Sequence, residues 1–77
     1  MIFKLPPGTD IAVAKEWLIE NIGPLYRGSK DIGEGWNMWS EMYRPDYNIR
    51  IEMQFYVKID GRKCRKGGMT AFKLKFI

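Results

Sequence analysis

The sequence predicts a small α+β domain in which one helix packs on one face of a mostly antiparallel, four-stranded sheet. Three observations lead to this class. The chain has 77 residues, enough for one domain and one core over residues 1–77. Apolar residues recur at helical spacing near its start, and from Trp36 onward they alternate with polar residues at the period of a strand. The expected order of elements is β-α-β-β-β.

A short strand and a helix open the chain. The run IFKL predicts a strand, and the following Pro-Pro-Gly ends it because these residues rarely continue a regular element. Thr9 or Asp10 can cap a helix over residues 11–22, and Gly23-Pro24 ends it. One stripe of this helix is apolar, and it consists of Ile11, Ala14, Leu18 and Ile22. Residues 24–35 carry three glycines and are expected to form a loop.

Two strands are expected next, over residues 36–44 and 47–59. A two-residue connection at Pro45-Asp46 places Met42 opposite Ile49 and Trp36 opposite Phe55, so that apolar residues meet. A slightly longer loop is the alternative, because proline in such a turn splays the strands. The second strand points one set of side chains toward the core: Tyr47, Ile49, Ile51, Met53, Phe55, Val57 and Ile59.

A last strand is expected near the end of the chain. Asp60-Gly61 predicts a hairpin that places Cys64 opposite Val57 and Phe72 opposite Ile49. In the competing model, residues 60–68 form a basic loop and the strand starts near Met69. Either model gives this strand a core face of Phe72, Leu74 and Phe76, with Ala71, Lys73 and Lys75 on the opposite face. The position of the first strand in the sheet stays open.

The composition argues against an enzyme. Histidine is absent, which removes the commonest general base and metal ligand, and Cys64 is the single cysteine. Gly28 and Gly33 have the spacing of a P-loop, yet Glu34-Gly35 stands where Lys-Ser/Thr must follow. An RNA-cleaving enzyme built on Arg, Lys and Tyr is physically possible, but no motif supports it. We therefore expect a non-enzymatic protein without a metal or other cofactor.

The chain has no apolar run long enough for a signal-peptide core or a membrane span. A single cysteine agrees with a reducing cytoplasm, so we expect a cytoplasmic protein without a membrane partner. Short chains that lack enzymatic signatures are common among phage and mobile-element proteins that block a host machine. The chain is therefore expected to be a regulator or inhibitor of this kind, acting in the host cytoplasm if it is phage-encoded.

The charge distribution suggests a polyanionic partner. The net charge is +4, and residues 61–77 hold six Lys/Arg and no acid. Cations release counterions from phosphates and exposed rings stack on unpaired bases, and alternation places Trp39 on the face opposite the helix. The candidate residues for binding nucleic acid or a partner are Trp39, Tyr43, Arg50, Tyr56, Lys58, Arg62, Lys63, Arg65, Lys66, Lys73 and Lys75.

Two explanations of this face compete with direct nucleic-acid binding. Glu41 and Glu52 share the face, and Glu41 is expected opposite Arg50, so an ordinary solvated face is one alternative. The preferred hypothesis is a binder of nucleic acid, or of a protein complex that handles it. The alternative function is a protein–protein inhibitor or adaptor that docks through its sheet edge and the Trp39 surface.

Overall fold

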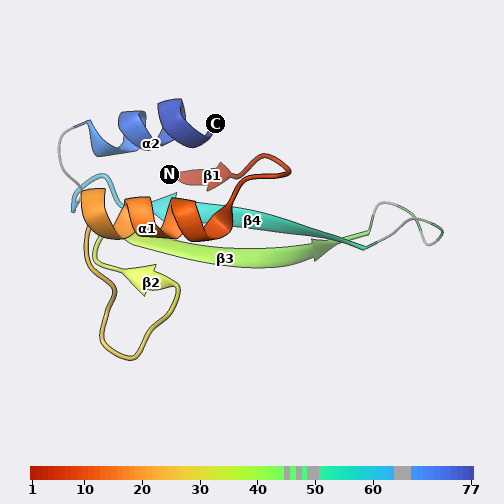
Figure 1. Cartoon of the computed structure of the whole chain (residues 1–77), viewed down its shortest axis with the longest axis horizontal. Coiled ribbons are helices and arrows are strands. Elements are labelled where there is room, and N and C mark those ends of the chain that lie inside the picture. The colour runs from red at the N-terminus through yellow and green to blue at the C-terminus, as the bar shows by residue number, and fades with distance from the viewer. Residues whose placement is uncertain (45, 47, 49–50, 64–66) are drawn as a thin grey trace.

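Four antiparallel strands form one sheet; one helix lies over one of its faces, and a second helix lies beside the edge strand near the N-terminus (Figure 1). The computed structural model describes residues 1–44, 46, 48, 51–63 and 67–77. The strand order is β1-β4-β3-β2. The elements are β1 (Ile2–Lys4), α1 (Ile11–Asn21), β2 (Ile32–Gly33), β3 (Trp36–Tyr43), β4 (Glu52–Ile59) and α2 (Gly68–Phe76). The predicted α+β class with a four-stranded antiparallel sheet is confirmed, and β1 lies at the sheet edge beside β4.

The predicted helix is present as α1. Its N-cap is Asp10, whose carboxylate accepts hydrogen bonds from the backbone N–H groups of Ala12 and Val13 at 3.1 and 3.3 Å. After the last turn, the N–H of Gly23 donates to the carbonyl of Leu18. The apolar stripe faces the sheet, where Ala14 and Leu18 are fully buried.

The register of β3 and β4 differs from the predicted one. Met42 pairs with Met53 and Trp36 with Ile59, so the predicted two-residue connection is wrong and residues 44–51 join the strands. The observed register brings Trp36 and Ile59 together under the helices, where both are buried. The partner of Met42 shifts by four residues, from Ile49 to Met53. Because this shift is even, each residue of β3 and β4 keeps its predicted face.

The predicted last strand is wrong, because residues 68–76 form the helix α2. A short apolar run does not distinguish a strand from a buried helix. Helical geometry places Phe72 and Phe76 on one face, whereas Leu74 points to solvent and is 82% exposed. Lys73 and Lys75 therefore do not belong to a strand. They lie in the last turn of α2, where cations complement the helix dipole.

The fourth strand lies in the segment that was expected to be a loop. β2 pairs with β3 through a turn that contains Gly35, whose φ of +85° favours glycine. An isolated bridge joins Leu25 to Gly33, and the Lys15 ammonium lies 2.7 Å from the Asp31 carboxylate. Residues 24–35 are therefore an ordered segment held against α1 and β3.

Phe72 anchors α2 to the rest of the core. Its ring centroid lies 5.6 Å from those of Phe3 in β1 and Trp17 in α1, and 5.0 Å from that of Phe76. The buried core consists of Phe3, Leu5, Ala14, Leu18, Ile22, Trp36, Met38, Val57, Ile59 and Phe72. Trp17 packs against this cluster and Trp36 belongs to it.

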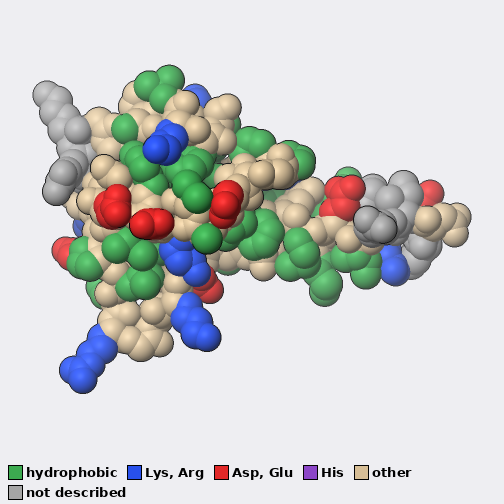
Figure 2. Space-filling model, viewed as in Figure 1, with side chains coloured by type: hydrophobic (Ala, Val, Ile, Leu, Met, Phe, Trp, Pro, Cys, Tyr) green, Lys and Arg blue, Asp and Glu red, His purple; other side chains and the backbone are tan. Residues whose placement is uncertain are grey.

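The β3–β4 hairpin extends beyond both helices (Figure 1), and we call its projecting part, residues 40–43 and 51–55, the arm. The predicted burial of Ile51 and Met53 is wrong, and Phe55 is only half-buried. Met53 is 52% exposed, and hydrophobic side chains line the arm on the helix side (Figure 2). The reason is length: an 11-residue helix spans about 16 Å and the 8-residue β4 about 27 Å.

Among the described residues, no helix has the length and apolar character that crossing a membrane requires.

Candidate nucleic-acid interface

The face of the sheet opposite the helices, called the outer face, carries the odd-numbered residues of β3 and the even-numbered residues of β4. Cross-strand pairing places Trp39 beside Tyr56 and Asn37 beside Lys58. On the other side of β4, Lys4 of β1 lies beside Tyr56. The outer face consists of Ile2, Lys4, Ile32, Asn37, Trp39, Glu41, Tyr43, Glu52, Gln54, Tyr56 and Lys58.

Two aromatic rings stack at the centre of the outer face. The ring centroids of Trp39 and Tyr56 lie 5.6 Å apart with an interplanar angle of 17°. The indole N–H of Trp39 donates to the Glu41 carboxylate at 3.4 Å, and the Tyr56 hydroxyl donates to the Gln54 side-chain oxygen at 2.8 Å. These bonds orient the rings, and both side chains stay only half-buried. The pair is a fixed, partly exposed aromatic surface.

Charge changes along the outer face. Lys58 lies two residues beyond Tyr56 toward the turn after β4, and that turn adds the exposed Arg62 and Lys63. In the opposite direction, toward the arm, the charged residues that β3 and β4 place on this face are Glu41 and Glu52. The outer face therefore has a basic end near the turn after β4 and an acidic end toward the arm, with the aromatic pair between them.

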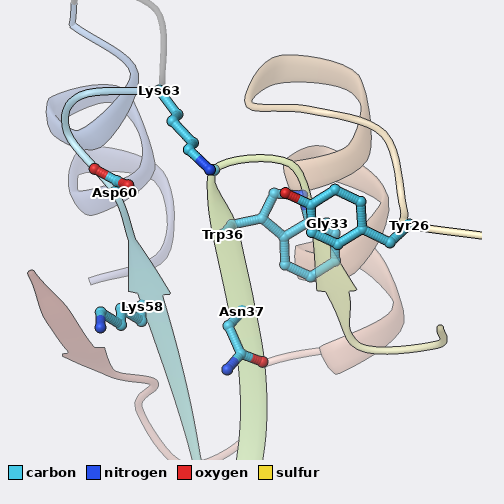
Figure 3. Close-up of a pocket in the computed structure, with 8 residues that line it drawn as sticks. Tyr26, Gly33, Trp36, Asn37, Lys58, Asp60 and Lys63 are labelled. Carbon is cyan, nitrogen blue, oxygen red and sulfur yellow. The ribbon is translucent and has the colours of Figure 1, made fainter.

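A hollow of about 220 Å³ lies at the basic end. In Figure 3, Lys63 extends from the turn after β4 toward the β2–β3 turn, while Lys58 and Asn37 project from neighbouring strands. Two ammonium groups and one carboxylate, that of Asp60, give the hollow a net positive charge. Asp60 also accepts a hydrogen bond from the backbone N–H of Arg62 at 2.9 Å. The lining residues are Tyr26, Gly33, Gly35, Trp36, Asn37, Lys58, Asp60 and Lys63.

Gly33 sets the position of Trp36 beside this hollow. The Trp36 indole donates from Nε1 to the carbonyl of Gly23 at 2.8 Å, and a Cβ added at Gly33 would overlap the indole. We expect Gly33→Ala to displace the ring and to lower the free energy of unfolding by about 1–3 kcal/mol, as overpacking does. Urea denaturation measures the loss. The control is Ile32→Ala, an exposed neighbour on β2, and equal stability of the two variants would contradict the prediction.

The structure brings together part of the predicted site. Trp39, Tyr43, Tyr56 and Lys58 share the outer face, and Arg62 and Lys63 adjoin its basic end. The placement of Lys73 and Lys75 on this face is wrong, because both belong to α2, which packs through Phe72 against Phe3 and Trp17 on the α1 side of the sheet. The predicted residues Arg50, Arg65 and Lys66 lie outside the described residues, as does Cys64.

Three residues of the candidate interface are absent from the predicted site. Lys4 and Asn37 extend the outer face, Asn37 also lines the hollow, and Tyr26 closes the hollow from the segment before β2. Alternation in IFKL already separates Lys4 from the core residue Phe3, but the position of β1 in the sheet was open. Tyr26 has no comparable signal, because its placement depends on the bridge between Leu25 and Gly33.

Within residues 1–44, 46, 48, 51–63 and 67–77, no group of three or more Cys, Asp or Glu side chains could hold a metal ion. The chain shows no significant similarity to a protein-family model, to a curated protein or to a solved structure.

Proposed function

We propose that this protein is a non-enzymatic binding protein that takes single-stranded nucleic acid on its outer face. The observation that carries this proposal is the stacked Trp39–Tyr56 pair on an open sheet face, with Lys4 and Lys58 beside Tyr56. Aromatic rings on an open surface stack with unpaired bases, and lysines beside them contact the phosphates that link those bases. The single cysteine of the chain fits a role in a reducing cytoplasm.

The change of charge along the outer face determines which part of it a bound strand occupies. Phosphates are attracted to Lys58, Lys63 and Arg62 at the basic end, and Glu41 and Glu52 repel them at the acidic end. A bound strand therefore runs from the hollow to the aromatic pair and ends before the arm. Bases inside a duplex are already stacked on their neighbours, so we expect single strands to bind more tightly than double strands.

A salt titration tests the proposal. Fluorescence anisotropy with labelled oligothymidylate and oligouridylate gives the binding constant K at increasing salt, and log K is expected to fall linearly with log salt. Each phosphate contact contributes a slope of about −0.7 for single strands. Changing Lys4, Lys58 or Lys63 to Gln is expected to flatten the slope by about that amount, because each change removes one contact.

Matched controls lie on α2. Lys73→Gln and Lys75→Gln remove the same charge from the opposite side of the sheet, so we expect both variants to keep the wild-type slope. The proposal is wrong if neither oligonucleotide binds at low salt, where electrostatic attraction is strongest. Equal flattening by the α2 variants and the outer-face variants would place the contact surface elsewhere.

A further inference from the structure

We propose that the edge of β4 in the arm binds an extended peptide strand of a partner protein, with an apolar side chain at every second position. This site goes beyond nucleic-acid binding and does not depend on it. It lies at the edge of the sheet and faces the helix side, away from Trp39. Two features carry the inference: a groove with apolar side chains on both walls, and unpaired backbone groups beside it. Together they require alternating side chains in an occupant.

The groove lies between the β1–α1 connection and the first half of β4, and it encloses about 520 Å³. Leu5 and the two prolines after it form one wall, and Met53 and Phe55 form the other. Figure 1 shows the β1–α1 connection running beside β4 at this point. The lining residues are Lys4, Leu5, Pro6, Pro7, Gly8, Thr9, Ile11, Ile51, Glu52, Met53, Gln54 and Phe55.

On the β1 side, β4 has no partner strand before Phe55 among the residues that the structure describes. The backbone N–H of Leu5 donates to the carbonyl of Phe55 at 2.9 Å, and Pro6 and Pro7 then turn the chain away from β4. In an antiparallel sheet, residues two apart direct their N–H and C=O groups to the same side. Met53 therefore points its N–H and C=O to the side where β1 has ended. None of the described residues pairs with these two groups.

These groups specify an extended strand as the occupant. A backbone donor and acceptor at strand spacing are satisfied by another strand, which is how sheet edges bind peptides. Side chains of the added strand alternate between the groove and the outer face. The groove side is lined by Leu5, Met53 and Phe55, so it accepts apolar side chains. The outer side has Lys4 and Glu52, whose opposite charges favour polar residues without a net charge.

The test uses a synthetic heptapeptide that alternates valine and threonine between two terminal lysines, labelled with fluorescein. We expect saturable binding by anisotropy and a slowing of amide hydrogen exchange at Met53 of at least about tenfold, since a new hydrogen bond protects that N–H. Two further peptides carry N-methyl groups on the valines or on the threonines. Only one set of N–H groups can face β4, so the two are expected to differ in affinity by at least about tenfold.

Variants of the protein complete the test. Met53→Asp places a charge in the groove and is expected to abolish peptide binding. Leu74→Asp makes the same change at an exposed site on α2 and is expected to leave binding intact. Unfolding curves of both variants confirm that they are folded.

Three results would overturn the proposal: no anisotropy change at millimolar peptide, equal affinity of the two methylated peptides, or unaltered binding by Met53→Asp. Protection of Met53 that rises with protein concentration in the absence of peptide would assign the edge to a second copy of the chain instead.

Discussion

Replacing Phe72 with alanine is expected to lower the free energy of unfolding by about 3–5 kcal/mol. Phe72 is fully buried, and its ring packs against those of Phe3, Trp17 and Phe76. The substitution leaves a cavity where α2, α1 and β1 meet. Since small domains have total stabilities near the low end of about 5–15 kcal/mol, we expect a large unfolded fraction at room temperature. Urea denaturation followed by circular dichroism measures the effect.

The control for Phe72→Ala is Leu74→Ala on the same helix. Leu74 is 82% exposed, so its replacement is expected to change the stability by no more than about 0.5 kcal/mol. The pair of variants separates two structures of this segment. A strand would bury Phe72 and Leu74 on one face and make both substitutions costly, whereas a helix makes only the first costly. Similar losses in both variants would contradict α2. Phe55→Ala is expected to cost less than Phe72→Ala, because Phe55 is half-buried at the start of the arm.

Replacing Trp39 with alanine is expected to weaken binding of single-stranded nucleic acid by about 1–3 kcal/mol, roughly 5- to 150-fold in Kd. The indole supplies half of the stacked aromatic pair, and alanine leaves no ring for a base to stack on. The salt dependence of binding is expected to stay unchanged, because no phosphate contact is lost. Anisotropy titrations at several salt concentrations measure both quantities. Trp39→Phe keeps a ring and is expected to retain most of the affinity.

Tyr43→Ala is the matched control for Trp39→Ala. Tyr43 lies on the same outer face, but at the acidic end beside Glu52. The proposed path of a bound strand ends before this position. We expect this variant to bind like the wild type. Equal losses in both variants would contradict the proposed path of the strand. If Trp39→Ala bound oligonucleotides normally but lost capture of a protein from nuclease-treated lysate, Trp39 would instead belong to a protein-docking surface.

Part of the interface follows from strand periodicity alone. Side chains alternate between the two faces of a strand. The sequence therefore assigns Trp39, Tyr56 and Lys58 to one face in the predicted register and in any register that differs from it by an even number of residues. The same reasoning separates Trp36 from Trp39 and places Trp36 in the core, where the structure has it. The stacking of Trp39 on Tyr56 also requires the observed register of β3 and β4, which pairs these two residues. The two-residue turn at Pro45-Asp46 predicts a different pairing.

The sequence by itself determined the class of the domain, the helix α1 with its cap at Asp10, and the face on which each residue of β3 and β4 lies, because these depend on local periodicity and capping. Tertiary structure alone decided the rest. Residues 68–76 become helical because only a helix brings Phe72 and Phe76 onto Trp17 together, and local sequence does not contain that contact. The register of β3 and β4 and the position of β1 likewise depend on which apolar residues the helices can cover. The helices are shorter than the β3–β4 hairpin, so the arm stays exposed.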